Sequence, residues 1–250
     1  MELYENERIN EINDSLRLIE QKDSLTFGTD AYLLSAILPK RQNNVCAELG
    51  CGSGVISLLA LNRKKCAHVY GIEVQEKIAD IAKRNAELNG LNEQFTVINS
   101  DLREIKASTF GKELDIVFSN PPYMKNDSGK ANESDFKNIS RHEVFGGIED
   151  FCACANRILK HGGSFYVVYR PDRMIDLFSA LRNANLEPKR VVFIHSSSNT
   201  PPSLLLVQAK KGAKSGIIIE KPLVMFKDGT NDYTDELNKI YECCEMENFQ

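Results

Sequence analysis

The sequence predicts an α/β fold in which a mostly parallel sheet carries helices on both faces. From about residue 43 onward, short apolar stretches typical of strands alternate with segments whose apolar residues recur at helical spacing. The first of these stretches ends in a run of glycines, as strand-to-helix turns in such folds often do. The last two are joined by a loop too short for a parallel crossover, so the last strand should be antiparallel.

Seven strands are expected, because each apolar stretch is short and bounded by turn residues. They lie at residues 45–49, 68–74, 95–99, 114–119, 165–169, 190–194 and 203–209. Residues 123–147 are polar and carry no periodicity, and a loop of that length in a compact domain is usually functional.

Helices are expected between these strands. Residues 55–61 follow the glycine run, and a second helix is closed by Asn89-Gly90. A third pattern runs from Ile148 to Leu159 and should be stopped by Gly162-Gly163. A fourth runs from Met174 to Leu181, and the first 42 residues form an N-terminal extension with a helix of its own at 31–38.

Composition excludes several classes of protein. The chain has 250 residues, 42% hydrophobic and 26% charged, which suits one α/β domain. No apolar run approaches the roughly 18 residues of a membrane span, and the N-terminus lacks the layout of a secretory signal. We therefore expect a cytoplasmic protein with no membrane contact. The net charge of −4 does not favour nucleic acid unless basic residues gather locally.

The seven cysteines are odd in number and contain no C-x-x-C pair. We therefore expect reduced thiols and no metal site. Cys152 and Cys154 fall inside a helical pattern, which indicates a packing role.

The glycine run at residues 48–54 reads Glu-Leu-Gly-Cys-Gly-Ser-Gly. Ligands of open α/β sheets bind at the carboxyl ends of strands, where glycines let the backbone approach them closely. Val55 stands where a dinucleotide fingerprint needs its third glycine. The carboxylate of Glu48 suits a ligand with ammonium and sulfonium charges better than a pyrophosphate. A tight turn without a ligand is the alternative.

Two more acids follow the next two strands. Glu73 can accept both ribose hydroxyls of an adenosine. Asp101 can accept from the adenine amino group, although helix capping explains it equally well. Acids at the ends of three successive strands predict S-adenosylmethionine as the cofactor. The predicted binding residues here are Glu48, Gly50, Cys51, Gly52, Gly54, Glu73, Val74, Asp101 and Leu102.

The fourth strand runs into Asn120-Pro121-Pro122-Tyr123, the predicted catalytic residues. Two consecutive prolines hold the backbone rigid. The Pro121 carbonyl and the Asn120 side-chain oxygen can accept both protons of an NH₂ group and align its nitrogen with a methyl donor. Tyr123 offers an aromatic face for a base, and Asn120 should also border the cofactor. A plain Asn-Pro turn is the alternative.

The glycine run paired with Asn-Pro-Pro-Tyr resembles class I amino-methyltransferases, which act on adenine, cytosine, guanine or glutamine amides. The chain is further similar to the bacterial valine-tRNA adenine-N6 methyltransferase family, whose target is the adenosine just 3′ of the anticodon. The segments that carry this narrower resemblance are residues 27–31, 141–143, 169–171, 186–190 and 221–224. The resemblance spans roughly residues 16–241.

The resemblance implies a Rossmann-like class I methyltransferase sheet at residues 43–250, with residues 1–42 packing over the cofactor site. It implies that Thr29 and Asp30 lie over the methionine end of the cofactor, although both can also cap a helix. The implied partner is the anticodon loop of tRNA. Candidate substrate contacts, which can equally be solvated side chains, are Lys125, Arg141, His142, Lys189, Arg190, Lys210 and Lys211.

Other functions remain open from the sequence. The same Asn-Pro-Pro-Tyr turn can hold a glutamine amide of a release factor, but the 42-residue extension looks too short for the helical domain of those enzymes. A guanine exocyclic amine in ribosomal RNA is a second alternative. An inactive RNA-binding module is a third, against which the intact Asn120 and the complete set of acids argue.

Overall fold

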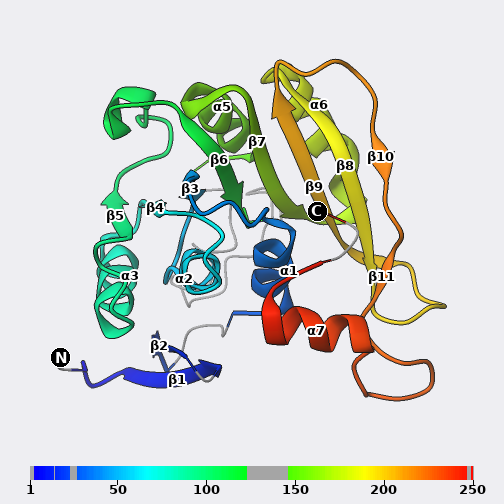
Figure 1. The fold of residues 1–250 in the computed structure, drawn as a ribbon, viewed down its shortest axis with the longest axis horizontal. Helices are drawn as coiled ribbons and strands as arrows, with labels where there is room; N and C mark the ends of the chain where they lie inside the picture. Colours follow the sequence, from blue (N-terminus) through cyan, green and yellow to red (C-terminus); the bar gives the residue numbers. More distant parts are fainter. Residues whose placement is uncertain (1–2, 14, 23–26, 123–145, 247–248, 250) are drawn as a thin grey trace, which may run out of the picture.

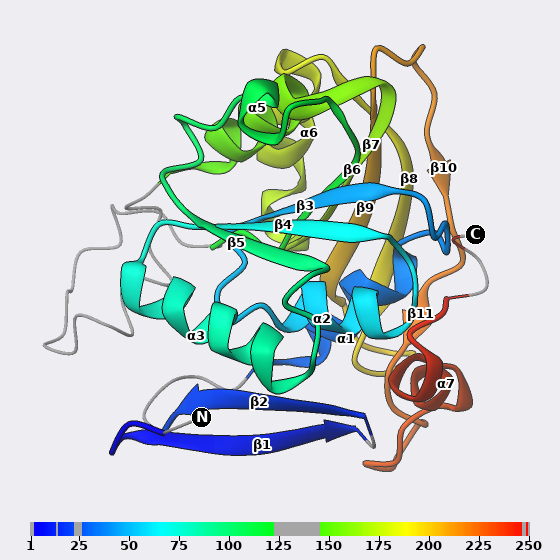
Figure 2. The ribbon, with the colours of Figure 1, turned by 60° about the vertical axis from the view of Figure 1, so that its left-hand side comes forward.

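A mixed β-sheet forms the middle layer of the molecule (Figures 1 and 2). The computed structural model describes residues 3–13, 15–22, 27–122, 146–246 and 249. The strands of this sheet are β3 (Val45–Leu49), β4 (His68–Glu73), β5 (Phe95–Asn99), β6 (Leu114–Ser119), β7 (Leu159–Tyr169), β8 (Leu186–His195), β9 (Pro202–Lys211), β10 (Ile218–Ile219) and β11 (Leu223–Val224). Their order is β10-β8-β9-β7-β6-β3-β4-β5, and β11 also pairs with β8.

The predicted α/β class and all seven predicted strands are confirmed. β9 inserts between β7 and β8 and runs antiparallel to both, as the short loop before it required. The sheet has nine strands rather than seven, because the two-residue strands β10 and β11 add parallel pairs to β8. Segments this short carry too little periodicity to be recognised from sequence.

Helices cover both faces of the sheet (Figure 2). One face carries α1 (Thr29–Ile37), α2 (Val55–Asn62) and α3 (Glu76–Leu88), and the other carries α5 (Ile148–Ile158) and α6 (Met174–Asn183). Each predicted helix is therefore present. The third one ends earlier than predicted: Leu159 opens β7, and Gly162-Gly163 lie in an irregular part of that strand, between its pairings of Leu159 and Ser164 with β6.

A pair of strands and a helix were also not predicted. β1 (Glu7–Asn13) and β2 (Leu16–Gln21) form an antiparallel pair that lies outside α2 and α3 (Figure 2). Helix α7 (Asp235–Cys243) packs beside α1. The sequence holds a start signal for α7, since Thr234 is followed by two acids and its hydroxyl accepts the N–H of Leu237 at 3.3 Å.

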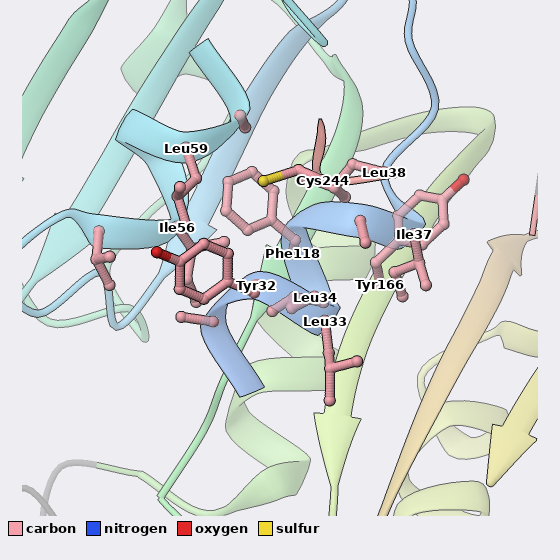
Figure 3. Packing of buried hydrophobic residues seen from close by; sticks show 14 of the residues in the cluster. Tyr32, Leu33, Leu34, Ile37, Leu38, Ile56, Leu59, Phe118, Tyr166 and Cys244 are labelled. Carbon is pink, nitrogen blue, oxygen red and sulfur yellow. The ribbon is translucent and has the colours of Figure 1, made fainter. Parts of the chain in front are cut away.

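Side chains of the central strands alternate between two hydrophobic clusters, one on each face of the sheet. In β6, Ile116 and Phe118 join the cluster under α1 and α2, whereas Val117 joins the cluster under α5 and α6. Alternation between two buried faces explains why these strands are apolar throughout. Figure 3 shows the first cluster, in which α1 residues such as Leu34 and Ile37 lie among side chains of α2, β6 and β7.

Helix α1 is therefore part of the main core. Leu33, Leu34 and Ile37 are at most 1% exposed. The end of α1 is held by the ammonium group of Lys65, which donates to the carbonyl oxygens of Ala36 and Leu38 at 3.1 and 2.8 Å.

We predict that Ile37→Ala lowers the free energy of unfolding by about 2–5 kcal/mol, because truncation leaves a cavity in this core. Ile175→Ala is the matched control, since Ile175 is also helical but 70% exposed. It should change stability by no more than about 0.5 kcal/mol. Urea unfolding followed by circular dichroism measures both. A loss of stability in Ile37→Ala as small as that expected for Ile175→Ala would place α1 outside the cooperative core.

Candidate active site

The glycine run forms a turn at the carboxyl edge of the sheet, between β3 and α2. Gly50, Gly52 and Gly54 have φ values of 69°, 54° and 85°, a region that side chains rarely adopt. The N–H groups of Gly50 and Cys51 both donate to the carbonyl oxygen of Ile72, at 2.9 and 3.0 Å. The turn is thus fastened to the end of β4.

Gly52 and Gly54 face different surroundings. A Cβ atom at Gly54 would lie 2.6 Å from the Phe95 ring, so this glycine is required by packing between α2 and β5. A Cβ atom at Gly52 would meet nothing within 4 Å. Gly52 therefore borders open space at the edge of the sheet where ligands of such folds bind.

Glu73 lies directly beside Gly52. Its carboxylate accepts the N–H of Gly52 and the N–H of Gln75, both at 3.0 Å. Burial raises the pKa of Glu73, and these hydrogen bonds partly oppose that rise. The half-buried Val74 follows, and its carbonyl oxygen accepts from the Asn99 amide at 3.0 Å.

Glu48 lies beneath the same turn and is 1% exposed. One of its oxygens accepts both the N–H and the hydroxyl of Ser57 in α2, at 3.0 and 2.5 Å. Burial raises the pKa of Glu48 to about 8, and the nearby Glu73 adds to the rise. The carboxyl group therefore holds the start of α2 against β3 and gains a proton more readily than an exposed acid.

Asp101 lies after β5 and turns toward Arg103. Its carboxylate accepts the Arg103 N–H at 2.8 Å and pairs with the guanidinium at 2.5–3.0 Å. These hydrogen bonds lower the pKa of Asp101. A turn and not a helix follows Asp101, so helix capping is not seen there, and the predicted contact with an adenine stays a prediction. Leu102 is buried, and its carbonyl oxygen accepts from Arg157 at 2.8 Å.

The predicted catalytic turn begins at Asn120, directly after β6. The Ser119 hydroxyl donates to the carbonyl oxygen of Leu49 at 2.7 Å, which joins this turn to the glycine turn. The Asn120 side-chain NH₂ donates to the Asp30 carboxylate at 2.7 Å. Pro121 is buried and Pro122 is half-buried. The predicted residues Tyr123, Lys125, Arg141 and His142 lie outside the described residues.

The start of α1 reaches both the catalytic turn and the C-terminal helix. While Asp30 binds Asn120, the hydroxyl of Thr29 hydrogen-bonds to the hydroxyl of Tyr241 in α7 at 2.7 Å. The ring of Tyr241 packs edge-on against Tyr32, with 4.7 Å between centroids. Tyr241 was not predicted, because no local sequence pattern indicates a contact across 212 residues.

The structure does not bring the predicted C-terminal basic residues to this site. Lys210 pairs in register with Ser164, and Lys211 donates to the carbonyl oxygen of Leu159 at 2.6 Å. Because β9 is antiparallel, its end lies at the amino edge of the parallel strands, opposite Asn120. Neither Lys189 nor Arg190 points to the site: Lys189 donates to the Lys214 carbonyl at 3.0 Å, and Arg190 pairs with Glu220 at 2.7 Å.

Within the described part of the chain, no three His, Cys, Asp or Glu side chains are grouped so as to hold a metal ion. No described helix is both long and apolar enough to cross a membrane. All seven cysteines are free, and Cys152 and Cys154 are fully buried in the cluster beneath α5, which confirms their packing role.

Comparison with known proteins gives related sequences and folds. The family model described as the methyltransferase small domain matches residues 22–185. A tRNA1(Val) (adenine(37)-N6)-methyltransferase of Bacteroides fragilis is 26% identical over 186 residues, covering 74% of this chain and 77% of the relative. One of the same description from Dyadobacter fermentans is 23% identical and covers 80% and 82%.

Solved structures share the fold. A protein from Agrobacterium tumefaciens, described as a predicted O-methyltransferase, superposes with a TM-score of 0.70 at 22% identity. The match covers 86% of this chain and 97% of that protein.

The buried Glu48 predicts a pH dependence of stability. Its pKa is about 8 in the folded chain against an ordinary 4.5, so the folded state holds more protons between these values. The contribution of Glu48 to the free energy of unfolding should therefore be highest below about pH 4.5 and fall as pH rises toward 8.

Glu48→Gln removes this titration and keeps an acceptor for Ser57, so its stability profile should be flatter from pH 5 to 8. Chemical unfolding across that range measures the slope, with the exposed Glu104→Gln as control. A wild-type slope in Glu48→Gln would contradict the prediction. Part of the slope should persist, because burial raises the pKa of Glu73 in the same direction.

Proposed function

Because this chain belongs to the methyltransferase small domain family, we propose that it methylates N6 of an adenine in tRNA with S-adenosylmethionine. The proposed target is adenine 37, next to the anticodon of a valine tRNA, as in the names of its bacterial relatives. The observation that carries the proposal is the juxtaposition of two turns. Asn120-Pro121-Pro122 lies beside the glycine turn, and the Ser119 hydroxyl joins them.

The open space beside Gly52 and Glu73 suits the adenosine half of S-adenosylmethionine. We assign Glu73 to the ribose hydroxyls, because its carboxylate already lies beside the Gly52 N–H at the end of β4. Asp101 and Leu102, one strand further, would border the adenine. Glu48, Thr29 and Asp30 would surround the charged methionine end, where acids favour an ammonium group.

The catalytic turn would act mainly by positioning. When bound, S-adenosylmethionine supplies a methyl group on a sulfonium, which a neutral amine can attack. The Pro121 carbonyl and the Asn120 side-chain oxygen would accept the two amine protons and turn the nitrogen lone pair toward that methyl. A general base before attack is unnecessary, because the nitrogen loses a proton after it becomes positive.

Asp30 would be a positioning residue for this step. A carboxylate accepts and does not donate, so the group of Asn120 that faces Asp30 must be its NH₂. The side-chain oxygen then lies on the other side of the amide. This is also how residues 1–42 would contribute to the site, as an extension packed over the cofactor with α1 at its end.

The choice of tRNA over a release factor is supported by the relatives. Those at 23–26% identity are described as tRNA methyltransferases. Such an enzyme would meet its substrate in the cytoplasm.

Incubation with labelled S-adenosylmethionine should transfer the label to bulk tRNA from a strain that lacks the gene. Nucleoside mass spectrometry should then find N6-methyladenosine at position 37 of a valine tRNA. Asn120→Ala should lower turnover by about 100-fold or more and change cofactor affinity little, because it removes an alignment contact. Label in release factor or ribosomal RNA, with none in tRNA, would overturn the substrate.

Gly52 offers a separate test of the cofactor site. Gly52→Ala and Gly90→Ala both place a side chain at positive φ with nothing within 4 Å, so both should cost about 1–2 kcal/mol of stability. Only Gly52 lies beside Glu73. Calorimetry should show that Gly52→Ala weakens S-adenosylmethionine binding about tenfold or more, whereas Gly90→Ala binds as wild type does. Equal affinities would remove Gly52 from the site.

A further inference from the structure

A cavity of about 520 Å³ opens beyond the catalytic turn, at the carboxyl end of β7. It is a shallow depression that is open to solvent rather than an enclosed pocket. The residues that line it are Arg170, Pro171, Asp172, Pro202, Ser203 and Leu204. None of them was among the predicted catalytic, cofactor or substrate residues.

The sheet register places this cavity next to the reacting centre. Ser119 of β6 pairs with Val167 of β7, so the chain after Ser119 runs alongside the chain that leads to Arg170. Tyr169 pairs with Leu205 of β9, which brings Leu204 next to Arg170. Adjacent strands lie about 4.8 Å apart. The cavity is therefore about one to two strand spacings, or about 5–10 Å, from the catalytic turn.

The lining combines apolar walls with the charged pair Arg170 and Asp172 and the hydroxyl of Ser203, which donates to the Ile194 carbonyl oxygen at 3.3 Å. Pro171, Pro202 and Leu204 present apolar surface. The Arg170 guanidinium donates to the Asp172 carboxylate at 2.9 and 3.3 Å. Their side chains are 52% and 60% exposed, so this ion pair is solvated and easily exchanged for another partner.

This combination fits an unpaired nucleobase better than a phosphate group. A base has flat apolar faces and an edge that carries both donors and acceptors, whereas a phosphate would meet the like charge of Asp172. Unpaired bases in RNA are recognised by stacking on flat groups, including guanidinium planes, and by hydrogen bonds to their edges.

We propose that this cavity binds the base of the nucleotide next to the target adenine. The proposal rests on the proposed function and deepens it, because it names a second contact with the same RNA loop. Asp172 accepts from an amino or imino group of that base, Arg170 donates to it or stacks on it, and the two prolines cover its face. Extruding the target base from its loop costs stacking energy, and anchoring the neighbour compensates for part of that cost.

The test removes the protein groups and the RNA base separately and together. Stem-loop RNAs carry the target adenine with an intact base or an abasic site at the nucleotide before it or after it. Wild type should lose about tenfold in kcat/KM at one of the two abasic positions, the scale of one base–protein stacking contact. The double variant Arg170→Ala/Asp172→Ala keeps the net charge and should lose about the same factor on intact RNA.

The decisive measurement is the activity of the double variant on the abasic RNA. If the cavity holds that base, the abasic RNA and the double variant together should lose no more than either change alone. Arg182→Ala/Glu187→Ala is the matched control, since it also removes an arginine–acid pair, 3.3 Å apart, but at the start of β8, away from the catalytic edge. This control should respond to the abasic RNA as wild type does.

Two results would overturn the proposal while methylation of intact RNA continues. One is that the decreases in kcat/KM caused by the abasic RNA and by the double variant multiply. The other is that wild type has the same kcat/KM on intact RNA and on both abasic RNAs. A wild type that methylates neither tRNA nor stem-loops would instead refute the proposed function, and the cavity assignment with it. Thermal unfolding and S-adenosylmethionine binding of the double variant should match wild type, because the pair lies on the surface.

Discussion

The hydrogen bond between Asn120 and Asp30 joins segments that lie 90 residues apart in the chain. It holds the amide of the proposed catalytic residue in one orientation, and it depends on the position of α1. That helix is fixed by the core beneath it and by Lys65 at its end. At its start, Thr29 is tied to Tyr241 of α7. The catalytic turn is thus supported by both ends of the chain.

The proposed site contains two buried acids, Glu48 and Glu73, whose burial costs free energy. Removing Glu48 and Glu73 from water disfavours their charged forms, and each is compensated by hydrogen bonds from the turn or from α2. The same contacts fix the glycine turn, whose three glycines have no side chains to hold it in place. A cationic ligand above this turn would favour the ionised acids, so cofactor binding and proton release would be linked.

The distribution of basic residues shows why sequence position alone does not indicate which edge of the sheet a charge occupies. Lys210 and Lys211 follow a strand, but that strand is antiparallel, so they lie at the edge remote from Asn120. Arg170 also follows a strand, and since β7 is parallel to β6, it lies beside the catalytic turn. Strand direction decides at which edge of the sheet each charge lies.

Local patterns in the sequence determined the α/β class, the seven main strands, the helices between them and the glycine and Asn-Pro-Pro turns. These follow from periodicity, from glycine conformations and from proline geometry, which act over a few residues. The tertiary structure alone decided the partners of Asp30, Thr29 and Glu48, the addition of β10 and β11 to the sheet, and the place of each basic residue. Such contacts join distant segments, and their geometry arises only when the sheet fixes strand order, direction and register.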